Sequence, residues 1–354
     1  MIYKHKITFI LPNLNGGGAE RVAVNYLRQL DTSKYHITLI VFDKTKDLLE
    51  LIPKGVRLID LQTNSTKNSF FVLIKELRSI KPDVVYTTHS RIATLLMFVK
   101  PFVSKFKHIA RMQSMPSLEK KHGEYGSLKR VLYASGFKSA DIVIAQTDQM
   151  KKDAVDIFKI DEANIKVLYN PIDKDYIQNN LKNATTPFEN DMINIVASGR
   201  LTKQKGFDLL IASLSNIVKI YPKVILHILG NDNGDGATLK KKVNNLELQQ
   251  NVVFLGFQNN PYRYYYFCDL FILSSRWEGF PNAMLENYYL NTPIVATKCV
   301  PIVSELIKDG INGYTCEVED MNCLSEKIIE CIENIKRENI KNPEYTGSKL
   351  EDLF

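Results

Sequence analysis

The sequence lacks long apolar runs, and this absence excludes one class of protein. No 18 consecutive residues are apolar, so no segment has the composition of a helix that crosses a membrane. The apolar stretch near the N-terminus (residues 7–11) is short and runs into a glycine-rich turn. This pattern argues against a signal peptide and favours a first buried strand.

Paired cysteines are also absent. The chain has five cysteines, all in its last quarter, and no Cys-x-x-Cys motif. An odd count without motif spacing predicts reduced thiols in a cytosolic protein rather than a disulfide framework. The six histidines do not cluster near the cysteines, so we expect no zinc site. The cysteines are Cys268, Cys299, Cys316, Cys323 and Cys331.

The nucleotide-binding fingerprints Gly-x-Gly-x-x-Gly and Gly-x4-Gly-Lys-Ser/Thr are absent as well. What the chain does have is the composition of an ordinary globular protein, with 45% hydrophobic and 24% charged residues. Disorder and collagen-like structure are therefore excluded for most of its length. Its 354 residues suggest two domains at roughly 100–200 residues each.

Short apolar runs alternate with helical patterns along the chain, which predicts α/β structure with mostly parallel sheets. The alternation stops in the polar segment 169–191, which we interpret as a linker or domain crossing, and then restarts. Each half is predicted to be a doubly wound, Rossmann-like domain, and residues 341–354 are expected to be frayed. The expected strands are residues 6–11, 36–42, 56–60, 83–86, 108–110, 141–145, 165–169, 193–198, 223–230, 251–256, 269–274 and 292–297. In the second half, helices are expected at 206–220, 236–246, 282–290, 302–308 and 320–338.

The net charge of +7 is concentrated in one segment. Residues 100–152 hold eleven Lys/Arg and four Asp/Glu, and the remainder is balanced. A solvated basic face and a surface that meets anionic lipid or a diphosphate are both compatible with this pattern. The candidate contacts are Lys105, Lys107, Lys120 and Lys121. No nucleic-acid-binding motif accompanies the charge, so nucleic acid is not an expected partner.

Three loops that follow predicted strands could carry chemistry, because ligands of such sheets bind at the carboxyl ends of strands. The loop at 12–21 holds three consecutive glycines, which suits close approach of a phosphate or simply a tight turn. Arg200 and Lys205 lie in a glycine-bounded loop and could neutralise a diphosphate leaving group, although an ordinary basic loop explains them equally well. Glu278 and Glu286 flank the start of a helix, where carboxylates could bind hydroxyls, although an acid at a helix start and a surface glutamate would also explain them.

Taken together, these motifs resemble glycosyltransferase family 4, whose members are retaining enzymes of the GT-B type. The resemblance spans nearly the whole chain, and the order and spacing of the motifs make it specific. The fragments that carry it are NGGGAER (15–21), YNPID (169–173), GRLTKQKG (199–206), EGFPNAMLE (278–286) and SELIKDGINGY (304–314). The family implies two Rossmann-like domains facing across a cleft. We place them at 1–172, which would bind the acceptor, and 173–354, which would bind the nucleotide sugar. Whether the C-terminal helix packs back on the first domain stays open.

The resemblance also implies roles for individual residues. Arg200 and Lys205 would hold the diphosphate, Glu286 the ribose, and Glu278 the hydroxyls of the transferred sugar. Backbone groups of Gly279, Phe280 and Asn282 would face the sugar and phosphates, while Gly17 and Gly18 would close over the diphosphate. The family needs no metal or other cofactor. An Asp-x-Asp triplet at Asp173 and Asp175 lies in the crossing, and Asp232 and Asp235 suit a turn, so no metal site is expected.

The acceptor side departs from the family pattern, because many members carry a histidine after the fifth strand. This chain has Arg111, Gln113 and Ser114 there, and His89 after the fourth strand. The resulting expectation is a retaining transferase that moves an N-acetylhexosamine or hexose from a UDP-sugar to a lipid-linked, polyprenyl-diphosphate type of acceptor. It would act as a peripheral protein at the cytoplasmic membrane face. Transfer to a soluble or protein acceptor, and a non-catalytic sugar-nucleotide binding protein, are the alternatives.

Overall fold

The computed structural model describes residues 4–15, 17–43, 48–63, 68–121, 126–345 and 347–354. The chain divides into two compact units, which are described separately. Unit 1 comprises Met1–Asp173 with Thr346–Phe354, and unit 2 comprises Lys174–Tyr345. The division thus lies one residue beyond the predicted boundary, and the C-terminal segment belongs to unit 1.

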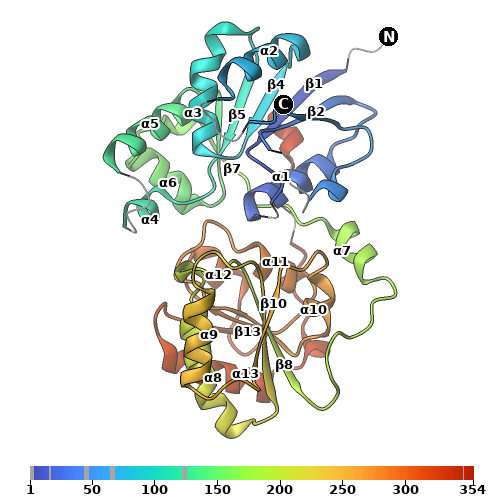
Figure 1. The fold of residues 1–354 in the computed structure, drawn as a ribbon, viewed down its shortest axis with the longest axis vertical. Helices are drawn as coiled ribbons and strands as arrows, with labels where there is room; N and C mark the ends of the chain where they lie inside the picture. The colour runs from blue at the N-terminus through green and yellow to red at the C-terminus, as the bar shows by residue number, and fades with distance from the viewer. Residues whose placement is uncertain (1–3, 16, 44–47, 64–67, 122–125, 346) are drawn as a thin grey trace. The chain divides into compact units, whose positions relative to one another are not determined.

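Unit 1 is built on a parallel sheet with the strand order β3-β2-β1-β4-β5-β6-β7 (Figure 1). The apolar runs predicted as strands form it, because a sheet covered on both faces buries nearly every residue of its strands. In chain order the strands are β1 (His5–Leu11), β2 (Tyr35–Val41), β3 (Arg57–Asp60), β4 (Val84–Thr87), β5 (Lys107–Arg111), β6 (Ile142–Ala145) and β7 (Ile165–Val167).

Helices cover both faces of this sheet. One core contains Val22, Tyr26 and Leu27 of α1, and the other contains Leu73 and Leu77 of α2 together with residues of α3. The described helices of unit 1 are α1 (Gly18–Gln29), α2 (Phe70–Ile80), α3 (Ser90–Val99), α4 (Pro116–Lys121), α5 (Ser127–Lys138) and α6 (Asp148–Asp156).

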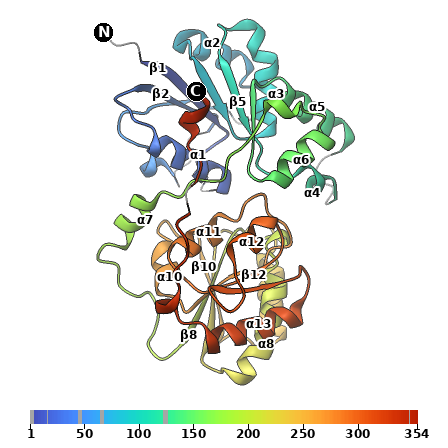
Figure 2. The same cartoon turned by 180° about the vertical axis from the view of Figure 1, so that it is seen from behind.

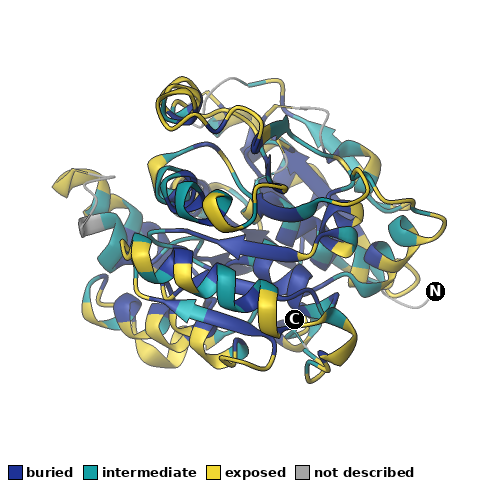
Figure 3. Ribbon diagram, turned by 90° about the horizontal axis from the view of Figure 1, so that it is seen from below, coloured by how far each residue is buried: buried dark blue, intermediate teal, exposed yellow. Residues whose placement is uncertain are grey.

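Unit 2 has a second parallel sheet, with the strand order β10-β9-β8-β11-β12-β13. Its strands are β8 (Ile193–Ser198), β9 (Val224–Leu229), β10 (Val252–Gly256), β11 (Leu270–Leu273), β12 (Ile294–Thr297) and β13 (Gly313–Cys316). Its helices are α7 (Lys174–Leu181), α8 (Phe207–Ile220), α9 (Gly236–Asn245), α10 (Tyr262–Phe267), α11 (Asn282–Tyr289), α12 (Pro301–Leu306) and α13 (Met321–Asn334). α8, α9 and α13 pack on one face of the sheet. In Figure 3 the strands are coloured mostly as buried, whereas the helices around them carry both buried and exposed residues.

Each sheet has one point where the strand order reverses direction. In unit 1 the reversal lies between β1 and β4, and in unit 2 between β8 and β11. At such a point the loops that leave two neighbouring strands turn to opposite faces, and ligands of doubly wound sheets bind in the crevice between them. The order of strands therefore selects four loops: those after β1, β4, β8 and β11.

Three segments differ from the sequence expectation. The polar segment 169–191 contains helix α7, which buries Ile177, and the aromatic helix α10 was not predicted. The C-terminal residues are not frayed: they end in a short 3-10 helix, η6 (Leu350–Leu353), which packs into the core of unit 1 (Figure 2). Leu350 and Leu353 lie in a weakly patterned tail, so the local sequence did not predict that they pack into this core. No helix within the described ranges has the length and apolar character needed to cross a bilayer.

Candidate functional site

The loops after β8 and β11 meet at the reversal point of unit 2. They are linked through the short 3-10 helix η4 (Lys203–Lys205) and the N-terminus of α8. Ser274 Oγ donates to the backbone oxygen of Lys205 at 2.8 Å, and the Arg276 amide donates to the Gln204 oxygen at 2.7 Å. Gly206 adopts φ +64°, and a Cβ there would lie 2.0 Å from the Ser274 backbone oxygen. Glycine is therefore required where the two loops touch.

Lys205 and Glu278 form an ion pair at this junction. The Nζ atom lies 2.5 Å from Oε1 of Glu278, whose side chain is only 7% exposed. Ser275 Oγ donates to the same carboxylate oxygen at 2.7 Å. The Lys205 stem lies over Gly199, where a Cβ would come within 2.7 Å of the lysine Cε. Two motifs that are 73 residues apart in sequence thus meet in one contact.

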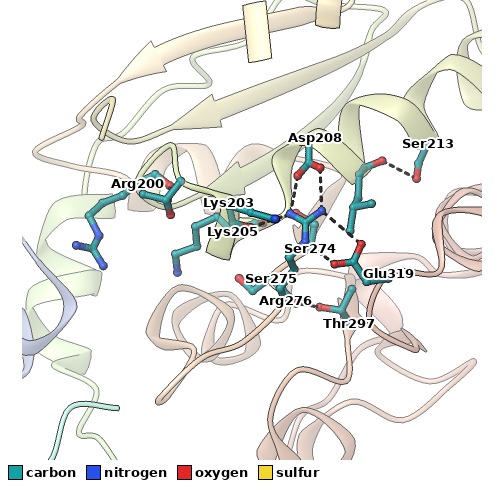
Figure 4. A network of polar contacts seen from close by, with 12 residues as sticks. Arg200, Lys203, Lys205, Asp208, Ser213, Ser274, Ser275, Arg276, Thr297 and Glu319 are labelled. Carbon is teal, nitrogen blue, oxygen red and sulfur yellow. Dashed lines mark hydrogen bonds and ion pairs between the residues drawn. The ribbon is translucent and has the colours of Figure 1, made fainter. Parts of the chain in front are cut away.

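Arg200 follows Gly199 directly and is exposed. In Figure 4 its side chain extends away from the network around Arg276, and the Lys205 amine also points away from that network. Both cations therefore lie apart from the Arg276 network, and Lys205 pairs instead with Glu278. An exposed guanidinium beside a partly exposed ammonium suits an anion such as a diphosphate.

Arg276 holds the two loops together from the inside (Figure 4). Its side chain is 8% exposed and makes a bidentate contact with Asp208, with Nη1–Oδ1 at 2.7 Å and Nη2–Oδ2 at 2.8 Å. It also donates from Nε to Glu319 at 2.5 Å and from Nη1 to the Lys203 backbone oxygen at 2.7 Å. This arginine was not identified from the sequence, because a basic residue in a loop has no pattern that reveals burial.

The charges of this network stabilise one another. Burial alone would raise the pKa of the Asp208 carboxyl, but the hydrogen bonds from Arg276 outweigh it and the pKa is lowered. The hydrogen bonds that Arg276 donates to Asp208, opposed by burial, raise the pKa of Arg276. Both groups are therefore charged at neutral pH.

Glu286 lies in the second turn of α11 and is buried, with Tyr262 Oη 3.4 Å from its Oε1. Phe280 is buried and Gly279 half-buried in the approach to this helix, and the Asn282 amide donates to the Phe280 oxygen at 3.0 Å. Helix α11 begins at Asn282, as predicted. Whether these groups contact a sugar nucleotide stays a prediction.

Cys299 follows β12 and lies near Glu278 and Lys205. Burial, reinforced by the Glu278 carboxylate, raises the pKa of its thiol. The sulfur is therefore a neutral thiol at physiological pH and is not available as a nucleophile. All five cysteines are free thiols, which confirms the prediction of a chain without a disulfide framework.

In unit 1, His89 and Gly17 lie at the reversal point, after β4 and β1. His89 Nε2 is 3.2 Å from the carboxylate of Glu20, so His89 is not simply exposed to solvent. Gly18 begins α1 and is exposed, and Gln113 is half-buried. Arg111 differs from the expectation of an acceptor-facing side chain. It is 1% exposed and donates to Asn170 Oδ1 at 2.5 Å, so it does not reach the surface in this structure.

The four lysines expected to form one basic surface come from segments before and after β5. Lys105 precedes β5 and Lys107 begins it, whereas α4, which ends at Lys121, follows β5. Opposite ends of a five-residue strand are roughly 17 Å apart. The side chains of Lys120 and Lys121 lie outside the described residues. Whether the four lysines contribute to one surface therefore stays a prediction.

The candidate metal residues have other partners. Asp173 accepts a hydrogen bond from Arg28 Nε, and Asp232 Oδ1 accepts from the amides of Gly234 and Gly236 at 2.9 Å each, which confirms the predicted turn. Among the residues that the structure describes, no group of three or more His, Cys, Asp or Glu side chains could hold a metal ion.

Comparison with known protein families gives two matches that together cover most of the chain. Residues 16–176 match the model of Glycosyltransferase Family 4, and residues 179–346 match that of Glycosyl transferases group 1. The junction between the two matches falls at the crossing from unit 1 to unit 2.

Curated relatives support the same family. An uncharacterized glycosyltransferase of Methanocaldococcus jannaschii is 33% identical over 255 residues, which cover 68% of this chain and 62% of that protein. The N-acetylgalactosamine-N,N'-diacetylbacillosaminyl-diphospho-undecaprenol 4-alpha-N-acetylgalactosaminyltransferase of Campylobacter jejuni is 26% identical, with 98% of this chain and 96% of that protein covered.

Among solved structures, HepE from Anabaena in complex with UDP and glucose has a TM-score of 0.76 at 20% identity, covering 93% of this chain and 90% of that one. WaaG, a glycosyltransferase involved in lipopolysaccharide biosynthesis, has a TM-score of 0.71 at 16% identity, covering 92% of this chain and 90% of that one. Similarity at this level shows the fold. The two parallel sheets, the family matches and the relatives together establish that the chain belongs to glycosyltransferase family 4 and is a glycosyltransferase of the GT-B type.

Proposed function

We propose that this enzyme transfers a hexose or N-acetylhexosamine, with retention, from a UDP-sugar to a hydroxyl of a lipid-linked glycan during the assembly of a surface polysaccharide. The observation that carries the donor assignment is the 2.5 Å contact between Lys205 and the buried Glu278 at the reversal point of unit 2. A cation and a carboxylate held together there match the two ends of a sugar nucleotide, which are an anionic diphosphate and a ring of hydroxyls.

In this proposal, donor binding breaks the Lys205–Glu278 ion pair and gives each residue a new partner on the donor. The diphosphate takes Lys205 and Arg200, and Glu278 turns its acceptor oxygens to sugar hydroxyls. The two cations then stabilise the negative charge that grows on the departing phosphate, which is the charge that limits the rate. Glu286 would hold the ribose, and the backbone near Gly279, Phe280 and Asn282 the sugar and phosphates.

Retention would follow from substitution on the front face of the sugar. The departing phosphate oxygen takes the proton of the incoming hydroxyl, the bond from the anomeric carbon to that phosphate oxygen breaks, and the new glycosidic bond forms on the same face. No protein nucleophile is needed. The fixed cations would do the work of a metal ion, so no metal is needed either.

Two relatives support the choice of substrates. HepE binds UDP and glucose, and the Campylobacter jejuni enzyme, by its name, acts on a diphospho-undecaprenol-linked sugar. Relatives from Escherichia coli and Erwinia amylovora serve O-antigen and amylovoran biosynthesis.

A donor and acceptor panel tests this proposal. The purified enzyme is incubated with UDP-glucose, UDP-galactose and their N-acetylated forms, with a polyprenyl-diphosphate-linked sugar or a soluble glycan, with and without EDTA. We expect one UDP-sugar to be used, transfer to the lipid-linked acceptor, unchanged rate in EDTA, and an α-linked product from the α-linked donor by NMR. Transfer only to the soluble glycan would contradict the lipid-linked assignment, and an inverted product would contradict retention.

Helix α5 is the proposed membrane contact. Leu128 is 83% exposed, Val131 and Leu132 are exposed one turn later, and Lys129 and Arg130 lie between them. α5 returns to β6, so its first turns lie at the carboxyl edge of the sheet, the edge at which Gly17 and His89 lie. Exposed apolar side chains interleaved with cations suit an anionic bilayer surface.

We expect the double variant Leu128→Ser/Val131→Ser to sediment with anionic liposomes at least threefold less than wild type, because its buried apolar area in the bilayer is lost. Ile220→Ser/Ile311→Ser is the matched control, since these two exposed apolar side chains belong to unit 2. Equal sedimentation of wild type and the α5 variant would overturn the assignment.

A further inference from the structure

Glu20 is a buried carboxylate that the proposed donor chemistry does not use. It lies in the first turn of α1, where a negative charge is favoured by the helix dipole. Its Oε1 atom is 3.2 Å from Nε2 of His89, and the two side chains are 10% and 13% exposed. This contact joins the first turn of α1 to the residue that precedes α3.

The imidazole of His89 is held at both nitrogens. Nδ1 lies 2.7 Å from the hydroxyl of Thr88, which is buried, and Nε2 faces the carboxylate. A carboxylate accepts, so Nε2 carries the hydrogen, and in the neutral ring Nδ1 accepts from the Thr88 hydroxyl. His89 is therefore a fixed anchor at the end of β4.

Glu20 also shapes the glycine loop after β1. A Cβ on Gly17 would lie 2.3 Å from Oε2 of Glu20, well inside van der Waals contact. The carboxylate can fold over the start of α1 because residue 17 has no side chain. Glu20 therefore bridges the loop after β1 and the loop after β4, which are the two loops at the reversal point of the unit 1 sheet.

We propose that Glu20 is a positioning residue for glycosyl transfer, which anchors the Gly17–Gly18 backbone to His89 at the reversal point of the unit 1 sheet. The inference rests on the proposed function, because it assigns the glycine loop a part in the transfer reaction. A loop that carries no side chains has little to hold it in place, and an error of about 1 Å in such a group can lower a rate 10²-fold. The Glu20–His89 contact supplies the missing restraint.

The test combines single and double variants. Glu20→Ala should lower kcat by about 10- to 100-fold and change the donor KM less than threefold, because a displaced loop lowers the rate whereas the residues proposed to hold the donor are unchanged. Glu20→Gln should retain most of the activity, since its amide oxygen can still accept from His89 Nε2. In a His89→Leu background, Glu20→Ala should cause no further loss of kcat.

Glu162→Ala is the matched control. Glu162 begins the short 3-10 helix η3 (Glu162–Asn164), pairs with Lys151 at 2.9 Å, and precedes β7, at the edge of the sheet far from the glycine loop. It should leave kcat unchanged. Thermal unfolding of every variant separates loss of fold from loss of rate, and His89→Leu breaks the same contact if Glu20→Ala does not fold.

Three results would overturn the inference: a kcat for Glu20→Ala within twofold of wild type, an equal loss for Glu20→Gln and Glu20→Ala, or additive losses in the double variant. These outcomes differ from failure of the proposed function. If wild type transfers no sugar from any UDP-sugar, the proposed function fails. If wild type is active and the Glu20 variants are equally active, only the positioning role fails.

Discussion

Lys205→Ala will lower kcat for glycosyl transfer by about 10²- to 10³-fold, the loss seen when a group that stabilises transition-state charge is removed. Lys205 is the partly buried cation of the proposed donor site, and its ammonium is within 2.5 Å of Glu278. When the donor's phosphate leaves, the negative charge on it increases, and a fixed ammonium stabilises that state more than the bound donor. The loss should therefore fall on kcat rather than on donor binding alone.

Lys203→Ala is the control for this experiment. Lys203 lies in the same turn and is exposed, and its backbone oxygen accepts a hydrogen bond from Arg276. The two variants remove the same charge from the same loop, so only the position of the ammonium differs. If Lys203→Ala and Lys205→Ala are equally active, the proposed role of Lys205 is wrong.

A measurement of folding separates the loss of the lysine's chemical contribution from a loss of stability. Removing Lys205 leaves the buried Glu278 carboxylate with the hydrogen bond from Ser275 but without the lysine's charge, which costs stability. Trp277, the chain's single tryptophan, adjoins Glu278, so its fluorescence reports unfolding of this loop. A variant that is folded by this criterion and still slow has lost the chemical contribution of the lysine.

Arg276→Leu will destabilise unit 2 by about 3 kcal/mol, the lower end of the range for breaking a buried ion pair, because Asp208 and Glu319 are partly exposed. The leucine removes the bidentate contact and leaves Asp208 without its main cation. It also frees the Lys203 oxygen that Arg276 holds at 2.7 Å, so the loop that carries Arg200 and Lys205 loses its internal support. We expect transfer activity to fall with stability.

Urea unfolding followed by Trp277 fluorescence measures this effect. Lys298→Ala is the control, since Lys298 pairs with Glu317 at the surface, with both side chains well exposed, and such pairs contribute about 0–1 kcal/mol. An Arg276→Leu midpoint equal to that of Lys298→Ala would show that the Arg276 network does not support the loop.

The same network predicts a pH dependence. The Asp208 pKa is lowered in the folded chain, so the pair's contribution is fully present above the unfolded pKa of about 3.9 and is lost as pH falls through the lower folded value. The stability of Arg276→Leu should therefore fall less on acidification than that of wild type.

Much of the fold could be predicted from local pattern, and the exceptions have identifiable causes. The apolar runs that form β1 to β12 are short, bounded by turn residues and rich in Ile, Val and Leu. This pattern is typical of strands that are buried on both faces. Helix α10 is a run of aromatic residues, which favour strands by propensity, and became a helix through its packing against α7 and α11. η6 is held by Leu350 and Leu353 in the core of unit 1, a contact that no local pattern records.

The candidate site divides in the same way. The sequence by itself determined which charged residues and glycines lie in the loops after predicted strands. It thereby identified Arg200, Lys205, Glu278 and the glycine loop at 15–18. Only the tertiary structure decided that Lys205 pairs with Glu278, that Arg276 supports both loops, and that Arg111 is buried while Glu20 anchors His89. The physical reason is that the charged and glycine residues of a loop can be identified from the sequence, whereas burial and ion pairing depend on which strands are neighbours. Strand order, which brings β1 beside β4 and β8 beside β11, is a property of the folded sheet and not of any segment of the chain.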